Sequence, residues 1–157
     1  MDVSKNPFEH VSKDHAAIWQ MLVYRDIEAF AKSDWMLIAD DFLQDKFYGI
    51  NARFSTDPHE WQLDFPILKD YRDSWLAQSQ LSRNKQYIEP LIIGIHKATT
   101  IEKMQIKSNK AAVWKKFNGE IKLVDGTSEI LKWQTIYFCE YHNTSWKIIG
   151  FIGYLPL

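Results

Sequence analysis

The chain has 157 residues, the size of one ordinary domain, so we expect a single domain over residues 1–157. Its formal net charge is only −1, and without a broad electrostatic field we expect neither nucleic acid nor a membrane surface as a partner. With one cysteine, no signal-peptide pattern at the amino terminus and no apolar run long enough to span a bilayer, we expect a cytoplasmic protein without a disulfide.

The first part of the chain has the hydrophobic spacing of helices. Between residues 14 and 32, apolar side chains recur at steps of three and four residues, which places on one helical face Trp19, Leu22, Val23, Ile27 and Phe30. Ser33 and Asp34 interrupt this pattern. Because either residue can cap a helix, a second helix is predicted over residues 35–42.

An extended piece, a loop and two further helices follow. Residues 47–54, FYGINARF, are predicted to be extended, and the Asp-Pro pair in STDPHEW is typical of a loop. A helix is predicted over residues 66–80, because proline suits the first turn and the apolar residues share one face. Residues 88–97 fit either a short helix opened by Pro90 or a strand, and we predict a helix.

The second half changes to the two-residue period of strands. Alternation and β-rich composition predict long strands within residues 102–117, 120–141 and 145–154. The turns between them are expected at Ser108–Asn109, Asp125–Gly126 and His142–Thr144. Asn118–Gly119 fits either a further tight turn or a bulge within one long strand.

Both faces of the predicted strand near the carboxyl end are partly apolar. One face carries Leu131, Trp133, Thr135, Tyr137, Cys139 and Tyr141, and the other includes Ile136 and Phe138. Helices followed by an antiparallel meander predict an α+β fold with the helices on one side of the sheet. We expect the outer sheet face to form a homodimer.

Four segments resemble the nuclear transport factor 2-like superfamily, in particular its SnoaL-like branch. They are AFAKSDW at the end of the first helix, IADDF at the end of the second, and the strands LKWQTIYFCEY and SWKIIGFIGYLP. The resemblance implies a cone, in which a curved antiparallel sheet wraps around about three N-terminal helices, with a pocket inside and dimers formed through the sheet. It implies activities that range from cyclases, dehydratases, isomerases and epoxide hydrolases to binding without catalysis.

The sequence contains no complete motif for a metal site, for covalent catalysis or for nucleotide binding. HEWQL begins like a zinc-protease helix, but Leu63 stands where the second histidine is required, so no metal is expected. Cys139 alternates within a predicted strand, where a cysteine is usually an inert small hydrophobe. No glycine-rich phosphate loop is present, and we expect no cofactor.

General acid-base chemistry remains, and the candidate catalytic residues are Asp26, Asp41 and His59. Asp26 lies on or beside the apolar face of the first helix, where Arg25, Lys32 or a neighbouring backbone group can also neutralise it. Asp41 matches the second acid of the family's DD segment and either borders the cavity mouth or satisfies the loop backbone. His59, like His96, can exchange protons near neutral pH or serve only at the surface or in the structure.

Aromatic residues make up 15% of the chain, and part of them can line a ligand pocket. The predicted pocket residues are Tyr24, Tyr48, Trp75, Trp114, Trp133, Tyr137 and Tyr154. Tyr48 and Tyr137 can donate hydrogen bonds to a substrate oxygen. We therefore expect a protein that binds a small apolar or cyclic molecule and acts on it by acid-base chemistry. The alternative is a non-catalytic dimerisation or binding module with the same fold.

Overall fold

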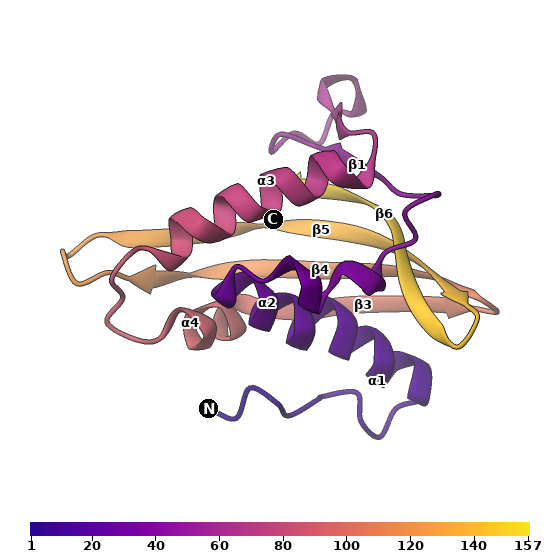
Figure 1. The fold of residues 1–157 in the computed structure, drawn as a ribbon, viewed down its shortest axis with the longest axis horizontal. Coiled ribbons are helices and arrows are strands. Elements are labelled where there is room, and N and C mark those ends of the chain that lie inside the picture. Colours follow the sequence, from indigo (N-terminus) through magenta and orange to yellow (C-terminus); the bar gives the residue numbers. More distant parts are fainter.

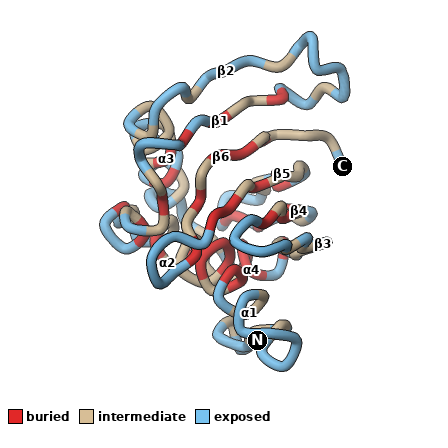
Figure 2. Tube along the Cα trace, turned by 90° about the vertical axis from the view of Figure 1, so that its right-hand side faces the viewer, coloured by how far each residue is buried: buried red, intermediate tan, exposed pale blue.

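A six-stranded sheet with helices on one face makes up the molecule (Figures 1 and 2). The computed structural model describes all residues from 1 to 157. The strands lie in the order β2-β1-β6-β5-β4-β3, with β1 Tyr48–Asn51, β2 Gln62–Phe65, β3 Thr99–Lys107, β4 Lys110–Lys122, β5 Ser128–His142 and β6 Ser145–Leu155. The predicted α+β class is confirmed.

The sheet is mixed, which corrects the prediction of a fully antiparallel one. β1 pairs in parallel with β6, whereas all other neighbouring strands are antiparallel. Parallel pairing requires a long connection between the two strands, and here residues 52–144 provide it. The turns expected at Ser108–Asn109, Asp125–Gly126 and His142–Thr144 do connect antiparallel strands.

The first predicted helix forms over nearly its full length, in three pieces. α1 spans Lys13–Trp19, a π-helical turn spans Gln20–Arg25, and α2 spans Asp26–Lys32. The hydroxyl of Ser12 caps the start by accepting a hydrogen bond from the His15 N–H at 3.0 Å. Ser33 ends the helix in the left-handed conformation, with φ at 53°.

Residues 35–42 do not form the predicted second helix. They form two short 3₁₀ turns, Trp35–Leu37 and Ala39–Asp41. Ile38 between them leaves the helical conformation, with φ at −122° and ψ at 0°. The break lets both Trp35 and Phe42 face the core, where their rings stack with centroids 5.2 Å apart.

The last two helices pack against the long strands. α3 spans Leu68–Arg83, and the ambiguous segment after Pro90 is helical, as α4 Leu91–Ala98. The Asn118–Gly119 pair is neither a turn nor a bulge, because both residues pair regularly within β4 and β5. A Cβ at Gly119 would lie 2.9 Å from the Cβ of Ala98, so glycine is needed for α4 to approach the sheet.

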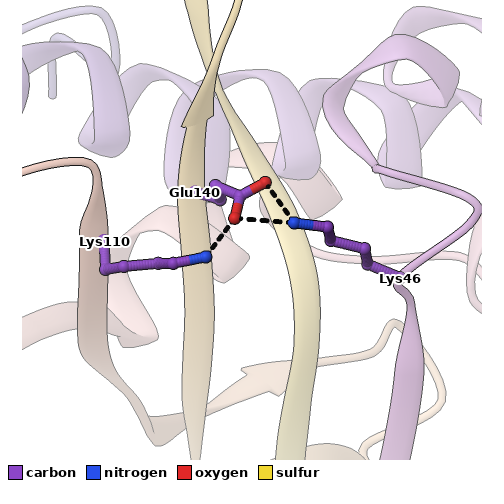
Figure 3. A network of polar contacts seen from close by, with 3 residues as sticks. All are labelled: Lys46, Lys110 and Glu140. Carbon is purple, nitrogen blue, oxygen red and sulfur yellow. Dashed lines mark hydrogen bonds and ion pairs between the residues drawn. The ribbon is translucent and has the colours of Figure 1, made fainter.

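An ion-pair cluster joins β4, β5 and the segment before β1 (Figure 3). The carboxylate of Glu140 accepts two hydrogen bonds from Lys46 Nζ, each 2.9 Å long, and a third from Lys110 Nζ. These partners lower the pKa of Glu140 to about 2.

No helix of the structure is long and apolar enough to cross a membrane.

Candidate functional site

A cavity of about 140 Å³ lies between the helices and the inner face of the sheet. Of its 17 lining residues, 12 are hydrophobic. The walls are mainly aromatic, with Phe30 from α2, Trp75 from α3, Phe117 from β4, Trp133 and Tyr137 from β5, and Phe151 and Tyr154 from β6. This composition is typical of sites that hold apolar ligands.

Asp26 is the only carboxylic acid among the residues that line this cavity. Its Oδ2 atom accepts a hydrogen bond from Lys115 Nζ at 2.9 Å, whereas Oδ1 makes no hydrogen bond within the protein. The side chain of Lys115 is fully buried, and that of Asp26 is 27% exposed. Asp26 therefore lines an apolar space with a carboxylate that has one oxygen without a protein partner.

Lys115 is held from several sides at once. Its Nζ atom donates to the backbone carbonyl of Leu22 and lies over the rings of Phe117 and Tyr137, 4.9 Å and 5.8 Å from their centroids. Aromatic faces attract a cation, and more strongly where water is excluded. These contacts compensate for the loss of hydration that a buried ammonium group suffers.

The π-helical turn explains why the Leu22 carbonyl is available. In a regular α-helix this carbonyl would accept a hydrogen bond from the N–H of Asp26, four residues later. Here the Asp26 N–H bonds to the carbonyl of Val23 instead. Lys115 occupies the Leu22 carbonyl, so the irregular turn positions both partners of the buried ion pair.

Three tyrosines supply phenol hydroxyl groups to the cavity, in addition to the aliphatic hydroxyls of Ser74 and Thr135. Tyr71, Tyr137 and Tyr154 all line it, and none of their hydroxyls hydrogen-bonds to another protein group. Burial raises the pKa of each of them, and that of Tyr71 and Tyr137 rises well above 10. All three are therefore neutral hydrogen-bond donors at physiological pH.

The structure brings part of the predicted pocket together: Trp75, Trp133, Tyr137 and Tyr154 line the cavity. Tyr24 does not, because its ring packs against His96 of α4 with centroids 6.5 Å apart.

Tyr48 and Trp114 do not line the cavity either, because side chains alternate along a strand. The buried neighbour Gly49 faces inward on β1, so Tyr48 faces outward and is 50% exposed. On β4 the buried Lys115 faces inward, and Trp114 lies on the outer face beneath the ammonium group of Lys103.

Asp41 lies near Asp26 but outside the main cavity. Arg25 binds its two carboxylate oxygens, with Nε–Oδ2 at 3.0 Å and Nη2–Oδ1 at 2.9 Å. Burial raises the pKa of Asp41, and the hydrogen bond from Arg25 opposes that effect. Asp41 and Asp26 share only a small void of about 10 Å³. Asp41 therefore ties its segment to the first helix.

Neither histidine candidate reaches the cavity. His59 lies on an exposed 3₁₀ turn, Pro58–Glu60, because the Asp57 carboxylate caps that turn at the surface. His96 is 5% exposed, and its Nε2 atom is buried without a partner. Burial, and then the charge of Lys115, lower the pKa of His96, so its ring is neutral at pH 7.

The principal residue that sequence reasoning missed is Lys115. In the segment AVWKKF, strict alternation places Lys115 on the same face as Val113 and Phe117. A lysine on an apolar strand face requires a countercharge, and Asp26 on the apolar face of the first helix is the matching partner. A lysine and an aspartate that each lie on an apolar face therefore indicate a buried ion pair, and this pattern is visible in the sequence.

A wider, open space continues from the cavity to solvent. It has a volume of about 820 Å³, and it shares with the inner cavity Phe30, Phe65, Ser74, Gln78, Ile95, Leu131, Trp133 and Tyr154. Its rim is polar and includes Arg53, Asp64 and Glu129. We call this space the vestibule. The inner cavity is thus accessible from one end of the molecule.

Comparison with solved structures identifies the fold. An NTF2-like protein of unknown function from Pseudomonas putida is 10% identical, with a TM-score of 0.57 over 89% of this chain and 84% of that one. One from Methylobacillus flagellatus is 17% identical, with a TM-score of 0.54 over 94% and 97% of the two chains. The chain has the NTF2-like fold.

The other comparisons do not indicate an activity for this chain. A domain of unknown function with a cystatin-like fold from Nostoc punctiforme is 16% identical, with a TM-score of 0.55 over 93% of this chain and 79% of that one. No family model and no curated protein matches the chain. Identities at this level support the fold alone, so the function must be argued from the site.

Proposed function

We propose that this NTF2-like protein binds a small, mainly apolar or cyclic molecule in the inner cavity and acts on it by acid-base chemistry. The observation that carries the proposal is the free Oδ1 atom of Asp26 at the wall of an aromatic cavity. A carboxylate in such a position can accept a proton from a bound molecule with little competition from water.

The ion pair also supports the charge change that proton abstraction requires. When Asp26 takes a proton, the bound molecule becomes anionic while Lys115 remains positively charged, so the total charge of the site is unchanged. The hydroxyls of Tyr71 and Tyr137 are available to donate hydrogen bonds to the new anionic oxygen. Isomerase, cyclase and dehydratase reactions that begin by removing a proton next to a carbonyl group pass through such a step.

The first experiment is native mass spectrometry of the protein purified from its expression host, with identification of any retained small molecule. We expect one molecule per chain. Incubated in D₂O, the wild-type protein should then exchange an acidic C–H of that molecule for deuterium, and Asp26→Asn should abolish the exchange.

Glu28→Gln is the matched control, because Glu28 lies on the same helix, pairs with Lys32 at 2.8 Å and does not line the cavity. It should exchange at the wild-type rate. Deuterium exchange that persists in Asp26→Asn would refute the catalytic role of Asp26. If a small molecule is retained but neither the wild type nor a variant exchanges its C–H, the protein binds the molecule without catalysis.

A homodimer through the outer sheet face is the second candidate role, and partly exposed apolar residues on that face favour it. Trp114, Ile136 and Ile152 lie side by side on β4, β5 and β6, next to Phe138. Such a contiguous apolar face is typical of a subunit interface. The dimer and the cavity are compatible, since they use opposite faces of the sheet.

Sedimentation velocity tests the dimer directly. The wild-type protein should sediment as a dimer at micromolar concentration, and Phe138→Asp should sediment as a monomer. Gln80→Asp, at an exposed position of α3 on the opposite side of the sheet, is the control and should stay dimeric. A monomeric wild-type protein would exclude this role.

A further inference from the structure

The inner cavity has the volume of a single six-membered ring. At about 140 Å³ it is close to an engineered protein cavity of about 150 Å³ that binds benzene. Two fused saturated rings or a cage compound would not fit without moving Phe117, Trp133 or Phe151, which pack in the walls. Any larger part of a ligand must extend into the vestibule.

The charge of the inner cavity is already balanced. Asp26 is the only charged side chain that lines the cavity, and Lys115 behind it carries the opposite charge. An ammonium group brought into this space would find the charge of Asp26 already neutralised by Lys115, and a carboxylate would lie beside the Asp26 carboxylate, so neither has a free countercharge to bind. Loss of hydration would then disfavour both kinds of ligand, so the buried part of the ligand should be neutral.

The polar groups select a hydrogen-bond donor. Oδ1 of Asp26 can only accept, and it has no donor within the protein. The tyrosine hydroxyls can either donate or accept, so they can satisfy the remaining lone pairs of a hydroxyl group. A hydroxyl on the ring therefore matches both types of partner.

We propose that the inner cavity binds a neutral six-membered ring that carries a hydroxyl group, and that this hydroxyl donates to Oδ1 of Asp26. This inference rests on the ligand-binding role proposed above and narrows it to a chemical class. Substituents on the far side of the ring extend into the vestibule, whose rim supplies the polar side chains of Arg53, Asp64 and Glu129.

Phenol is the simplest probe, because it is neutral at pH 7. We would titrate it into ¹⁵N-labelled protein and follow the tryptophan indole N–H signals by NMR. The signals of Trp75 and Trp133, assigned with Trp75→Phe and Trp133→Phe, should shift. Those of Trp61 and Trp114, which lie outside the cavity, should not.

Matched probes separate size, charge and hydrogen bonding. Toluene has the same ring without a donor, benzylamine and benzoate are charged at pH 7, and 1-adamantanol is a neutral alcohol too wide for the cavity. Phenol should bind at least about tenfold more tightly than toluene, the effect of one hydrogen bond to a charged group. The two charged probes and 1-adamantanol should bind more weakly than phenol.

Asp26→Asn should reduce the preference for phenol over toluene towards one, and Glu28→Gln should leave it unchanged. Tighter binding of benzylamine, benzoate or toluene than of phenol would overturn the proposed ligand class. If no probe shifts Trp75 or Trp133 but a retained molecule does, the ligand class is wrong and the binding role stands. If neither does, both are wrong.

Discussion

Replacement of Asp26 by asparagine leaves the ammonium group of Lys115 buried without its countercharge. The two groups lie 2.9 Å apart, and the lysine side chain has no exposure to solvent. At an effective dielectric constant of about 20, their attraction is about 6 kcal/mol, most of which offsets the cost of removing both ions from water. Removal of one partner therefore lowers the stability of the folded state by more than the intact pair contributes to it.

From the behaviour of buried pairs that lose one partner, Asp26→Asn should lower the free energy of unfolding by about 3–5 kcal/mol. For a chain of this length that corresponds to a fall in Tm of about 6–20 °C. Lys115→Met should cost less, about 1–3 kcal/mol, because the Asp26 side chain is 27% exposed and its carboxylate can remain hydrated from the cavity.

The double variant Asp26→Asn/Lys115→Met completes a thermodynamic cycle. Because it leaves no buried charge, it should be more stable than Asp26→Asn alone, and the coupling energy should reach about 1–3 kcal/mol. Urea unfolding at pH 7, followed by tryptophan fluorescence and circular dichroism, measures all four proteins. The reasoning would be refuted if the two changes in the free energy of unfolding were additive, or if Lys115→Met lost more stability than Asp26→Asn.

Three further predictions concern other parts of the fold. The pKa of Glu140 is about 2 when folded, against an ordinary value of 4.5, so its contribution to stability is present above pH 4.5 and is lost as the pH falls towards 2. Urea midpoints measured across that interval should therefore fall less steeply for Glu140→Gln than for the wild type, and parallel curves would contradict the assignment. Gly119→Ala should cost about 1–3 kcal/mol in the same assay, because its Cβ would lie 2.9 Å from that of Ala98, and a neutral result would show that α4 yields easily. Burial raises the pKa of Cys139 to about 12, so a thiol reagent at pH 8 should label it only in urea, and rapid labelling of the native protein would disprove its burial.

Local patterns predicted most of the helices and strands, but not β2 and not how distant strands pair. Helical spacing marked residues 14–32, and turn residues marked the hairpins of the second half, because both signals lie within a few neighbouring residues. The parallel pairing of β1 with β6 joins segments that are far apart in the sequence, and no local period encodes it. The break at Ile38 depends on tertiary packing of aromatic rings, which overrides a helical pattern.

The candidate site, like the fold, was predictable only where local patterns determine the position of a residue. Asp26 was a candidate because its place on an apolar helical face does not depend on the rest of the fold. Trp114 was expected on the inward face of its strand, but the strand has the opposite orientation and Lys115 faces inward. Only a contact between β4 and the first helix, distant in sequence, shows that Lys115 can be buried.

The π turn at Gln20–Arg25 sets the rotational phase of α2 relative to α1. Each residue of an α-helix advances the side-chain direction by about 100°. Deletion of one residue from this turn would therefore leave both apolar segments helical but rotate α2 by roughly a quarter of a circle or more, moving Asp26 out of reach of Lys115. In this chain, the insertion or loss of a single helical residue is enough to assemble or dismantle the charged pair of the cavity.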